Sequence, residues 1–374
     1  MAAPPAAAQF RGSLAKLAPR INRDPALFYQ ELYGAYKRKD AATSRLRAIL
    51  TEAEAAYYNT GRPLISDAAY DTLQELLEES DAIARGPAGT KAGRRAAAAA
   101  PVKPVAAAKK HVGAPVPEGD ARKVVLPHWM GSMDKVKDAK ALSAWQREHA
   151  GAVVVSDKLD GVSALVVVQE DGSLRMYSRG DGRVGQDISF LLPLLGKGGL
   201  PAFGTKGTKG TRGAALQPGM AVRGELIITR SDFERELSGR MANARNAVSG
   251  LVNSKNPDAG TAAVTGFVGY ELVVPAGLAI STQLERLGKL GFATAWHSRL
   301  APAAAFGFGV EQLRDILLRR KGESPYEVDG IVVQHDATGY TPAAGTNPSY
   351  AFAFKSADAQ ANAQASPPSI SFIS

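Results

Sequence analysis

The chain has 374 residues and a net charge of +9, with 45% hydrophobic residues and no cysteine. This length allows two domains with cores of their own. The lack of cysteine excludes disulfides, cysteine-ligated zinc and iron–sulfur clusters, and the five scattered histidines do not suggest a metal cage. No apolar run approaches the roughly 18 residues of a membrane-spanning helix, so no membrane partner is expected. We expect any metal to have oxygen ligands and to arrive with a substrate.

The positive charge is concentrated in three segments rich in Ala, Gly or Pro, at residues 1–23, 85–123 and 196–218. They carry fifteen net positive charges, which leaves the rest of the chain at about −6. Such segments can hold a nucleic-acid backbone loosely through counterion release, or they are plain solvated linkers. The first is compatible with an organelle transit peptide or a disordered arm. We expect an intracellular protein of the cytoplasm or nucleus, with organelle import as the alternative.

The N-terminal third predicts one small folded module. Residues 25–83 place apolar side chains at helical spacing, with Ser66 and Asp67 positioned as an N-terminal cap. We expect a disordered arm over residues 1–24 before this helical module and an extended linker over residues 84–123 after it.

From residue 124 to 358 the pattern changes to short β-branched runs bounded by Gly and Asp, followed by a disordered tail at 359–374. The runs AVVVSDKLDG, SALVVVQEDGSLRMYS, MAVRGELIIT, FVGYELVV, DGIVVQH and YAFAFK predict strands, and EDGS predicts a hairpin turn. Helices are expected at 138–149, 231–239, 281–290 and 310–320. The sequence therefore predicts an α+β domain built on antiparallel sheets, with residues 196–218 as an insertion and not a phosphate loop.

The motif DKLDG at residues 157–161 places Lys158 at the end of a predicted buried strand. Desolvation and nearby cations disfavour an ammonium ion, which makes Lys158 a candidate nucleophile. A single KxDG is more simply a lysine that ends a strand. Five further charged motifs follow it, each expected in a strand or at its end: SRGDGRVGQD (178–187), VRGEL (222–226), NARNAVSGLVN (243–253), YEVDGIVV (326–333) and YAFAFK (350–355). Together they supply a nucleophile, carboxylates for metal and ribose, and cations for phosphate, which nucleotidyl transfer requires.

With these motifs in this order, the sequence resembles the NAD⁺-dependent DNA ligase family from about residue 40 to 358. The resemblance implies an antiparallel-sheet, ATP-grasp-like nucleotidyltransferase domain preceded by a small helical domain. It implies that the lysine of KLDG attacks the α-phosphorus of NAD⁺, gives lysyl-AMP and NMN, and passes AMP to the 5′-phosphate of nicked double-stranded DNA. NAD⁺ would be the AMP donor and Mg²⁺ the metal.

The resemblance also assigns roles to single residues. The catalytic set would be Lys158, Asp160, Glu225, Asp329 and Lys355, of which Glu225 and Asp329 would also serve the metal. Asp160 and Arg179 would position ribose and phosphate, and Arg245 and Lys355 would neutralise phosphate charge. Ser132 and Met133 would wall the adenine pocket, with a plain surface turn as the alternative for their segment. The NMN half of NAD⁺ would be held by the helical module through Tyr57, Tyr58, Asp67, Tyr70 and Asp71, because aromatic faces stack on a cationic ring and carboxylates accept from ribose hydroxyls. Plain helix packing and capping is the alternative for Tyr57, Asp67, Tyr70 and Asp71.

Four positions depart from the commoner pattern of the family: Ser156 and Gln186 stand in place of Glu, Asn253 in place of Arg, and Gln334 in place of Lys. We expect a divergent branch that has changed its charge partners together; a weakened enzyme is the alternative. No OB-fold motif follows residue 358, so sealing is expected to need that domain from a separate chain. The rival hypotheses are an ATP- or GTP-dependent polynucleotide ligase or capping-type enzyme, and a non-catalytic protein that binds NAD⁺ or nicked DNA.

Overall fold

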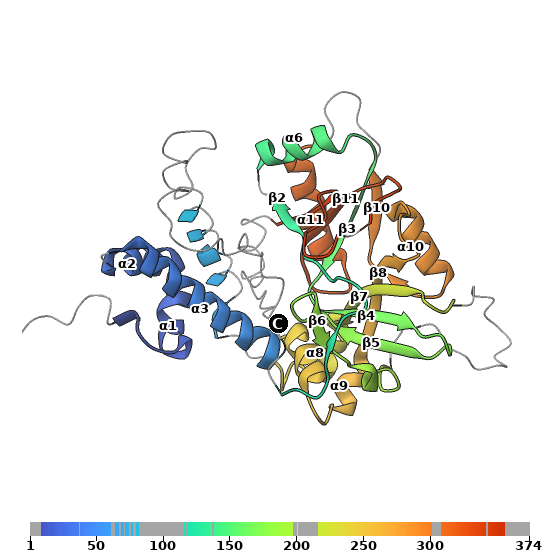
Figure 1. Ribbon diagram of the computed structural model, residues 1–374, viewed down its shortest axis with the longest axis horizontal. Coiled ribbons are helices and arrows are strands. Elements are labelled where there is room, and N and C mark those ends of the chain that lie inside the picture. Colours follow the sequence, from blue (N-terminus) through green and yellow to red (C-terminus); the bar gives the residue numbers. More distant parts are fainter. Residues whose placement is uncertain are drawn as a thin grey trace, which may run out of the picture. The chain divides into compact units, whose positions relative to one another are not determined.

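The chain folds as two compact units, residues 1–115 and 116–374, each of which is described by itself. The computed structural model describes residues 9–36, 38–60, 64–66, 69–70, 72–74, 76–77, 80–81, 116, 119–136, 138–196, 200, 216–300, 308–341 and 343–355 (Figure 1). Within those ranges, none of the helices combines the length and the apolar composition needed to cross a lipid bilayer. The predicted tail at 359–374 and nearly all of the predicted insertion and linker lie outside the described residues.

The N-terminal unit is helical, with α1 (Leu14–Arg23), α2 (Pro25–Ala35), α3 (Lys39–Thr60) and further helical residues between 69 and 81. Asp24 caps α2 by accepting a hydrogen bond from the Leu27 amide at 2.9 Å, and Pro25 follows at the first helical position. The three helices share one apolar core whose fully buried members include Phe10, Leu14, Ile21, Phe28, Leu32, Leu46 and Ile49. Ser66 caps the next helical stretch as predicted, since its hydroxyl accepts from the Ala69 amide.

The prediction of a disordered arm over residues 1–24 is wrong for residues 9–24. Leu14, Leu17, Ala18 and Ile21 recur at helical spacing, and α1 buries all four of them in the core of the helical unit. The composition of this segment, rich in Ala and basic residues, concealed that spacing because its apolar stripe is only four residues long. Residues 1–8 lie outside the described residues.

The second unit contains two five-stranded sheets, in the orders β10-β3-β11-β12-β2 and β5-β4-β7-β8-β9, and the two-stranded sheet β1-β6. All neighbours are antiparallel except the short parallel pairs β12–β2 and β8–β9, which confirms the predicted α+β class built mainly on antiparallel sheets. The strands are β1 (Lys123–Val125), β2 (Asp134–Val136), β3 (Val153–Leu159), β4 (Val162–Val168), β5 (Leu174–Ser178), β6 (Val184–Gln186), β7 (Ala221–Ile228), β8 (Thr265–Val274), β9 (Ala293–Thr294), β10 (His297–Leu300), β11 (Val328–His335) and β12 (Ala351–Phe354).

Helices pack against both large sheets (Figure 1). α6 (Ala139–Glu148) and α11 (Val310–Glu323) share an apolar cluster with β3, β11 and β12. The larger cluster over β4, β5, β7 and β8 takes side chains from α8 (Ala244–Asn253), α9 (Ala259–Val264) and α10 (Ile280–Lys289). The helix α7 (Arg230–Glu236) and the short helix η2 (Ser189–Leu191) complete this unit's described helices.

Two sequence expectations need correction here. The segment NARNAVSGLVN was expected in a strand or at its end, but it forms α8, because Asn243 caps the helix at the Asn246 amide and Ala247, Val248 and Leu251 form its buried face. The predicted linker 84–123 also ends too late, since residues 119–123 are part of the second unit and Lys123 opens β1.

A tight turn joins the two large sheets. β3 belongs to the first and β4 to the second, and only Asp160 and Gly161 separate them. A Cβ atom on Gly161 would lie 2.3 Å from the carbonyl oxygen of Leu226 on β7, so only glycine fits the turn. The KLDG motif therefore lies where the two sheets meet. The EDGS hairpin between β4 and β5 forms as predicted, with Gly172 at a φ of 79°.

Candidate active site

Three adjacent strands bring two lysines to one carboxylate. Lys158 Nζ donates to both carboxylate oxygens of Asp329 on β11, at 3.0 Å each. Lys355, which follows β12, places its Nζ 3.1 Å from Asp329 Oδ2. The register between β3 and β11 shifts at Asp329, which is an extra residue between the pairs Val328↔Leu159 and Gly330↔Lys158. Such a bulge re-aims a side chain, here toward the lysines.

The charge state of this cluster is set by its ion pairs. Burial raises the pKa of Asp329, but the ammonium groups of Lys158 and Lys355 outweigh it and hold that pKa well below its usual range. The sequence suggested that burial and nearby cations would disfavour the ammonium form of Lys158. In the structure the Lys158 side chain is 31% exposed and its nitrogen donates to the Asp329 carboxylate. Asp329 therefore fixes the direction of the Lys158 side chain.

A second ion pair joins the turn after β3 to the first turn of α8. Arg245 Nη1 donates to Asp160 Oδ1 at 2.6 Å, and both side chains are mostly buried. The sequence predicted both residues for ribose and phosphate without pairing them. Since Asp160 follows Lys158 by two residues, this pair ties the N-terminus of α8 to the nucleophile motif.

Glu225 on β7 is the buried acid of the site. Its Oε2 accepts from Ser163 Oγ at 3.0 Å, across the β4–β7 pair. Burial raises the pKa of Glu225, against the opposing charges of Arg245, Lys158 and Arg179. These charges place the β7 acid among the same cations that surround Asp160 and Asp329. The lysines and carboxylates of the predicted catalytic set thus come together with the two predicted phosphate-binding arginines, from separate parts of the sequence.

The comparison with known families decides what this cluster belongs to. The sequence pattern described as the NAD-dependent DNA ligase adenylation domain matches residues 120–358. The chain belongs to this family. It is 36% identical over 302 residues to a DNA ligase of Acanthamoeba polyphaga mimivirus, covering 80% of this chain and 40% of the relative. It is 29% identical over 323 residues to a DNA ligase of Roseiflexus castenholzii, covering 80% of this chain and 42% of that one. The chain thus spans about two fifths of the length of these relatives.

Among solved structures, an archaeal ATP-dependent RNA ligase overlaps 63% of this chain and 50% of its own, at 15% identity and a TM-score of 0.37. A similarity at this level carries no conclusion about the nucleotide used.

Several predicted residues of the adenylation domain are not joined to the cluster by any described contact. Ser132 and Met133 are half-buried in the segment between β1 and β2. Their neighbour Gly131 accepts from Arg223 Nη2 at 2.5 Å, which fastens this segment to β7. The role of Ser132 and Met133 as an adenine wall stays a prediction.

The predicted NMN-binding residues lie in the other unit. The side chains of Tyr57 and Tyr58, and all of Asp67 and Asp71, lie outside the described residues. The Tyr70 hydroxyl donates to Glu54 on α3, and its ring packs against the helical core. Tyr70 therefore has a packing role in the helical unit, and its proposed contact with NMN is untested.

Sequence reasoning missed two contributors. Lys321 on α11 is half-buried, and burial lowers the pKa of its ammonium while Asp329 raises it and Lys355 lowers it. Lys321 is thus a further cation beside the lysine–aspartate cluster. Tyr270 on β8 lies 3.1 Å from Ser163 Oγ through its hydroxyl, and burial raises its pKa to about 12. The available signals were weak: a basic residue late in a helix, and one tyrosine within an apolar strand.

The predicted metal ligands do not by themselves form a metal site. No group of three or more acidic or histidine side chains suited to a metal occurs in the described parts of the chain. Both oxygens of Asp329 accept from ammonium groups, and the pKa of Glu225 is raised by its burial. A divalent cation would therefore need oxygen ligands from a bound phosphate.

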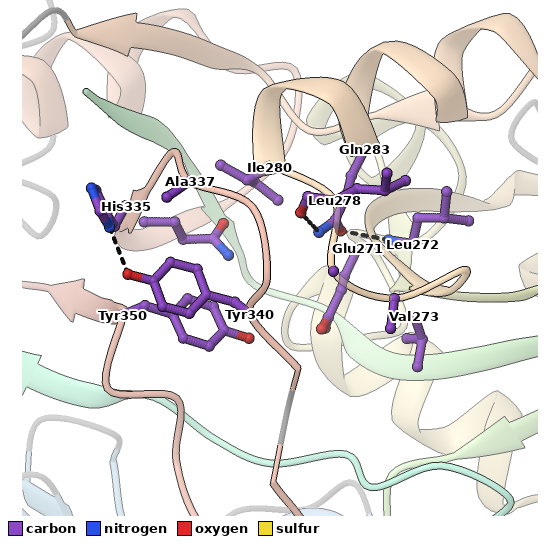
Figure 2. Close-up of a pocket in the computed structure, with 13 residues that line it drawn as sticks. Glu271, Leu272, Val273, Leu278, Ile280, Gln283, His335, Ala337, Tyr340 and Tyr350 are labelled. Atoms are coloured by element: carbon purple, nitrogen blue, oxygen red, sulfur yellow. Dashed lines mark hydrogen bonds between the residues drawn. The ribbon is translucent and has the colours of Figure 1, made fainter. Parts of the chain in front are cut away.

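A pocket opens between β8, the start of α10 and the segment after β11 (Figure 2). Two aromatic rings form one wall, since Tyr340 and Tyr350 stack with centroids 4.2 Å apart and an interplanar angle of 15°. The Tyr340 hydroxyl lies 2.6 Å from His335 Nδ1, which fixes that ring. Gln334, one of the four departures from the family pattern, lines this pocket together with Glu271. Position 334 therefore presents a neutral amide to a polar pocket.

Proposed function

We propose that this chain is the adenylation part of an NAD⁺-dependent DNA ligase, with Lys158 as the residue that takes up AMP. The observation that carries this proposal is the shared carboxylate: Lys158 and Lys355 both contact Asp329, and Lys158 donates to both of its oxygens. A lysine held in a fixed direction by a carboxylate, next to other cations, suits an attack on the phosphorus of a phosphoanhydride.

In the proposed step, Lys158 Nζ forms a bond to the α-phosphorus of NAD⁺ and the bond from that phosphorus to the bridging oxygen breaks. Lys158 first releases one proton to solvent, so that a neutral amine attacks; NMN leaves with the bonding electron pair, and the nitrogen then passes a second proton to solvent. Lys355, Arg245 and Arg179 would offset the charge of the phosphate oxygens, while Asp160 and Glu225 would accept from ribose hydroxyls. A phosphate that draws Lys355 toward itself would take that cation away from Asp329. Substrate binding would thereby be coupled to the ion pair between Asp329 and Lys158.

The partners follow from the same proposal. Mg²⁺ would bind mainly through phosphate oxygens, with Glu225 or Asp329 as the protein's contribution. Nicked double-stranded DNA would receive the AMP on its 5′-phosphate.

The helical unit would select NAD⁺ through its NMN half, using Tyr57, Tyr58, Asp67, Tyr70 and Asp71. We expect Tyr57→Ala and Asp67→Ala to impair adenylation by NAD⁺ and to spare any sealing of pre-adenylated DNA. The same loss in both assays would contradict this division of labour.

Intact-protein mass spectrometry after incubation with NAD⁺ and Mg²⁺ tests the main proposal. We expect an AMP adduct that added NMN removes and that Lys158→Ala abolishes. Lys123→Ala, on the exposed edge of β1, is the control and should form the adduct normally. Adduct formation from ATP or GTP in place of NAD⁺ would favour the rival nucleotidyltransferases. Failure to form any adduct with a correctly folded protein would leave a binding protein and overturn the proposal.

A further inference from the structure

A partly buried polar network lies at the far end of α8 from Arg245. Arg122 donates from Nε and Nη2 to the two oxygens of Asp120, at 3.2 and 3.1 Å. The Gln186 side-chain amide donates to Asp120 Oδ2 at 2.7 Å, and Gln186 itself is only 5% exposed. The Arg122 hydrogen bonds hold the pKa of Asp120 down to about 2 against its partial burial, with a smaller contribution from Gln186. We name these three residues the 120–122–186 network.

The same guanidinium binds the backbone carbonyls at the C-terminus of α8. Arg122 Nη1 donates to the Val252 carbonyl at 3.0 Å and lies 3.4 Å from that of Ser254, and Nη2 lies 3.3 Å from that of Asn253. The last carbonyls of a helix have no partner within the helix, and a cation there opposes the helix dipole. The last turn of α8 has no basic residue of its own. Arg122, directly before β1, therefore supplies the cation that the last turn of α8 lacks.

We propose that the 120–122–186 network anchors the C-terminus of α8 and so positions Arg245, in the first turn of that helix, against Asp160. Arg122 and Gln186 are positioning residues in this account, because they act through Arg245. The functional half of the inference rests on the proposed adenylation; the structural half does not.

The network also accounts for two departures from the family pattern, Gln186 and Asn253, because both residues lie at this end of α8. A glutamate at position 186 would set a second carboxylate against Asp120, whereas the amide of Gln186 can donate to it. An arginine at position 253 would bring a second guanidinium to carbonyls that Arg122 already occupies. The side chain of Asn253 instead donates to the Ser249 carbonyl at 3.0 Å, within the helix.

The first test exchanges the acid and the amide. Gln186→Glu should lower the melting temperature by about 4 °C or more, because the new carboxylate faces Asp120. The double variant Asp120→Asn/Gln186→Glu restores one amide and one acid, and should recover most of that loss. Gln217→Glu, the same substitution at an exposed position, is the control and should change little. If Gln186→Glu behaves like the control, or if the double variant is worse than the single, the anchor is refuted.

The second test asks whether Arg122 acts through Arg245. In a double-mutant cycle on the rate of adduct formation from NAD⁺, Arg122→Ala should slow the reaction about tenfold or more, and should add almost nothing once Arg245→Ala is present. Arg175→Ala, which breaks a half-exposed pair between β5 and Asp187, serves as the control. Losses that multiply would show that Arg122 does not position Arg245 and would overturn that step. If the protein without substitutions forms no AMP adduct, the proposed function fails. The melting temperatures of the Gln186 variants still test whether the network anchors α8.

Discussion

Asp157 and Arg320 form a buried, two-point ion pair on the face of β3 opposite Lys158. Arg320 Nε and Nη2 donate to the two oxygens of Asp157 at 2.9 and 3.0 Å, and both side chains are almost fully buried. The Ser324 hydroxyl donates to the same carboxylate at 3.0 Å, and the guanidinium lies 4.4 Å from the centroid of the Trp296 ring. Because side chains alternate along a strand, this pair holds one face of β3 in place, and Lys158 projects from the other face toward the site.

We expect Asp157→Asn to destabilise the domain by about 3 kcal/mol, because it leaves the Arg320 guanidinium buried without its counter-charge. Urea denaturation followed by circular dichroism measures this. Lys289→Ala removes an exposed lysine from its pair with the exposed Glu285 on α10, and should leave the midpoint nearly unchanged. Equal midpoints for the two variants would contradict a structural role for the Asp157–Arg320 pair.

Asp329→Asn should leave two ammonium groups side by side with no carboxylate between them. Since the folded-state pKa of Asp329 is lowered, its charge stabilises the fold above the unfolded pKa, and this contribution is lost as the pH falls. We expect a loss of about 1–2 kcal/mol at pH 7 that shrinks below pH 4, together with loss of the AMP adduct. Asp315→Asn, at an exposed position of α11, is the matched control. A stability difference that does not change with pH would rule out the ion pairs as its source.

Glu225→Gln should have the opposite effect on stability. Burial raises the folded-state pKa of Glu225, so its contribution to stability is greatest below the unfolded pKa and is lost as the pH rises through the folded value. The neutral variant should therefore be more stable than the parent by about 1 kcal/mol at pH 7.5 and equal to it near pH 4. Denaturation curves at both pH values measure this, and adduct formation should fall at the same time. A variant that is less stable at pH 7.5 would show that the contacts of the ionised acid outweigh its burial.

Gly161→Ala should destabilise the domain by about 2–3 kcal/mol, because its Cβ would lie 2.3 Å from the Leu226 carbonyl oxygen where the two sheets meet. Gly250→Ala, in the middle of α8 with no atom within 4 Å of the new Cβ, should instead stabilise by about 0.5–1 kcal/mol. Thermal denaturation of the two variants compares the same substitution at a position without room for a Cβ atom and at one with room for it. Two variants of equal stability would show that the β3–β4 turn can open to admit a methyl group.

The local sequence determined much of this protein. Apolar alternation in the runs that became β3, β4, β7, β8 and β11 predicted strands, and EDGS predicted the hairpin, because these signals involve neighbouring residues only. The order of KLDG, RGDG, RGE, VDG and AFK indicated the family, which the comparison confirmed. The same local reading failed for α1 and α8, whose short apolar faces are recognisable as helical only against the cores that they cover.

Only the tertiary structure decided which charges meet. Nothing in the sequence pairs Lys158 with Asp329 across 171 residues, or Arg122 with the end of α8 across 130. Those contacts depend on strand register and on where a helix ends, which the packing of the whole domain fixes. The state of each charge depends in turn on burial and on its neighbours, as Asp329 and Glu225 show: two carboxylates of the same site, one with a lowered pKa and the other with a raised one.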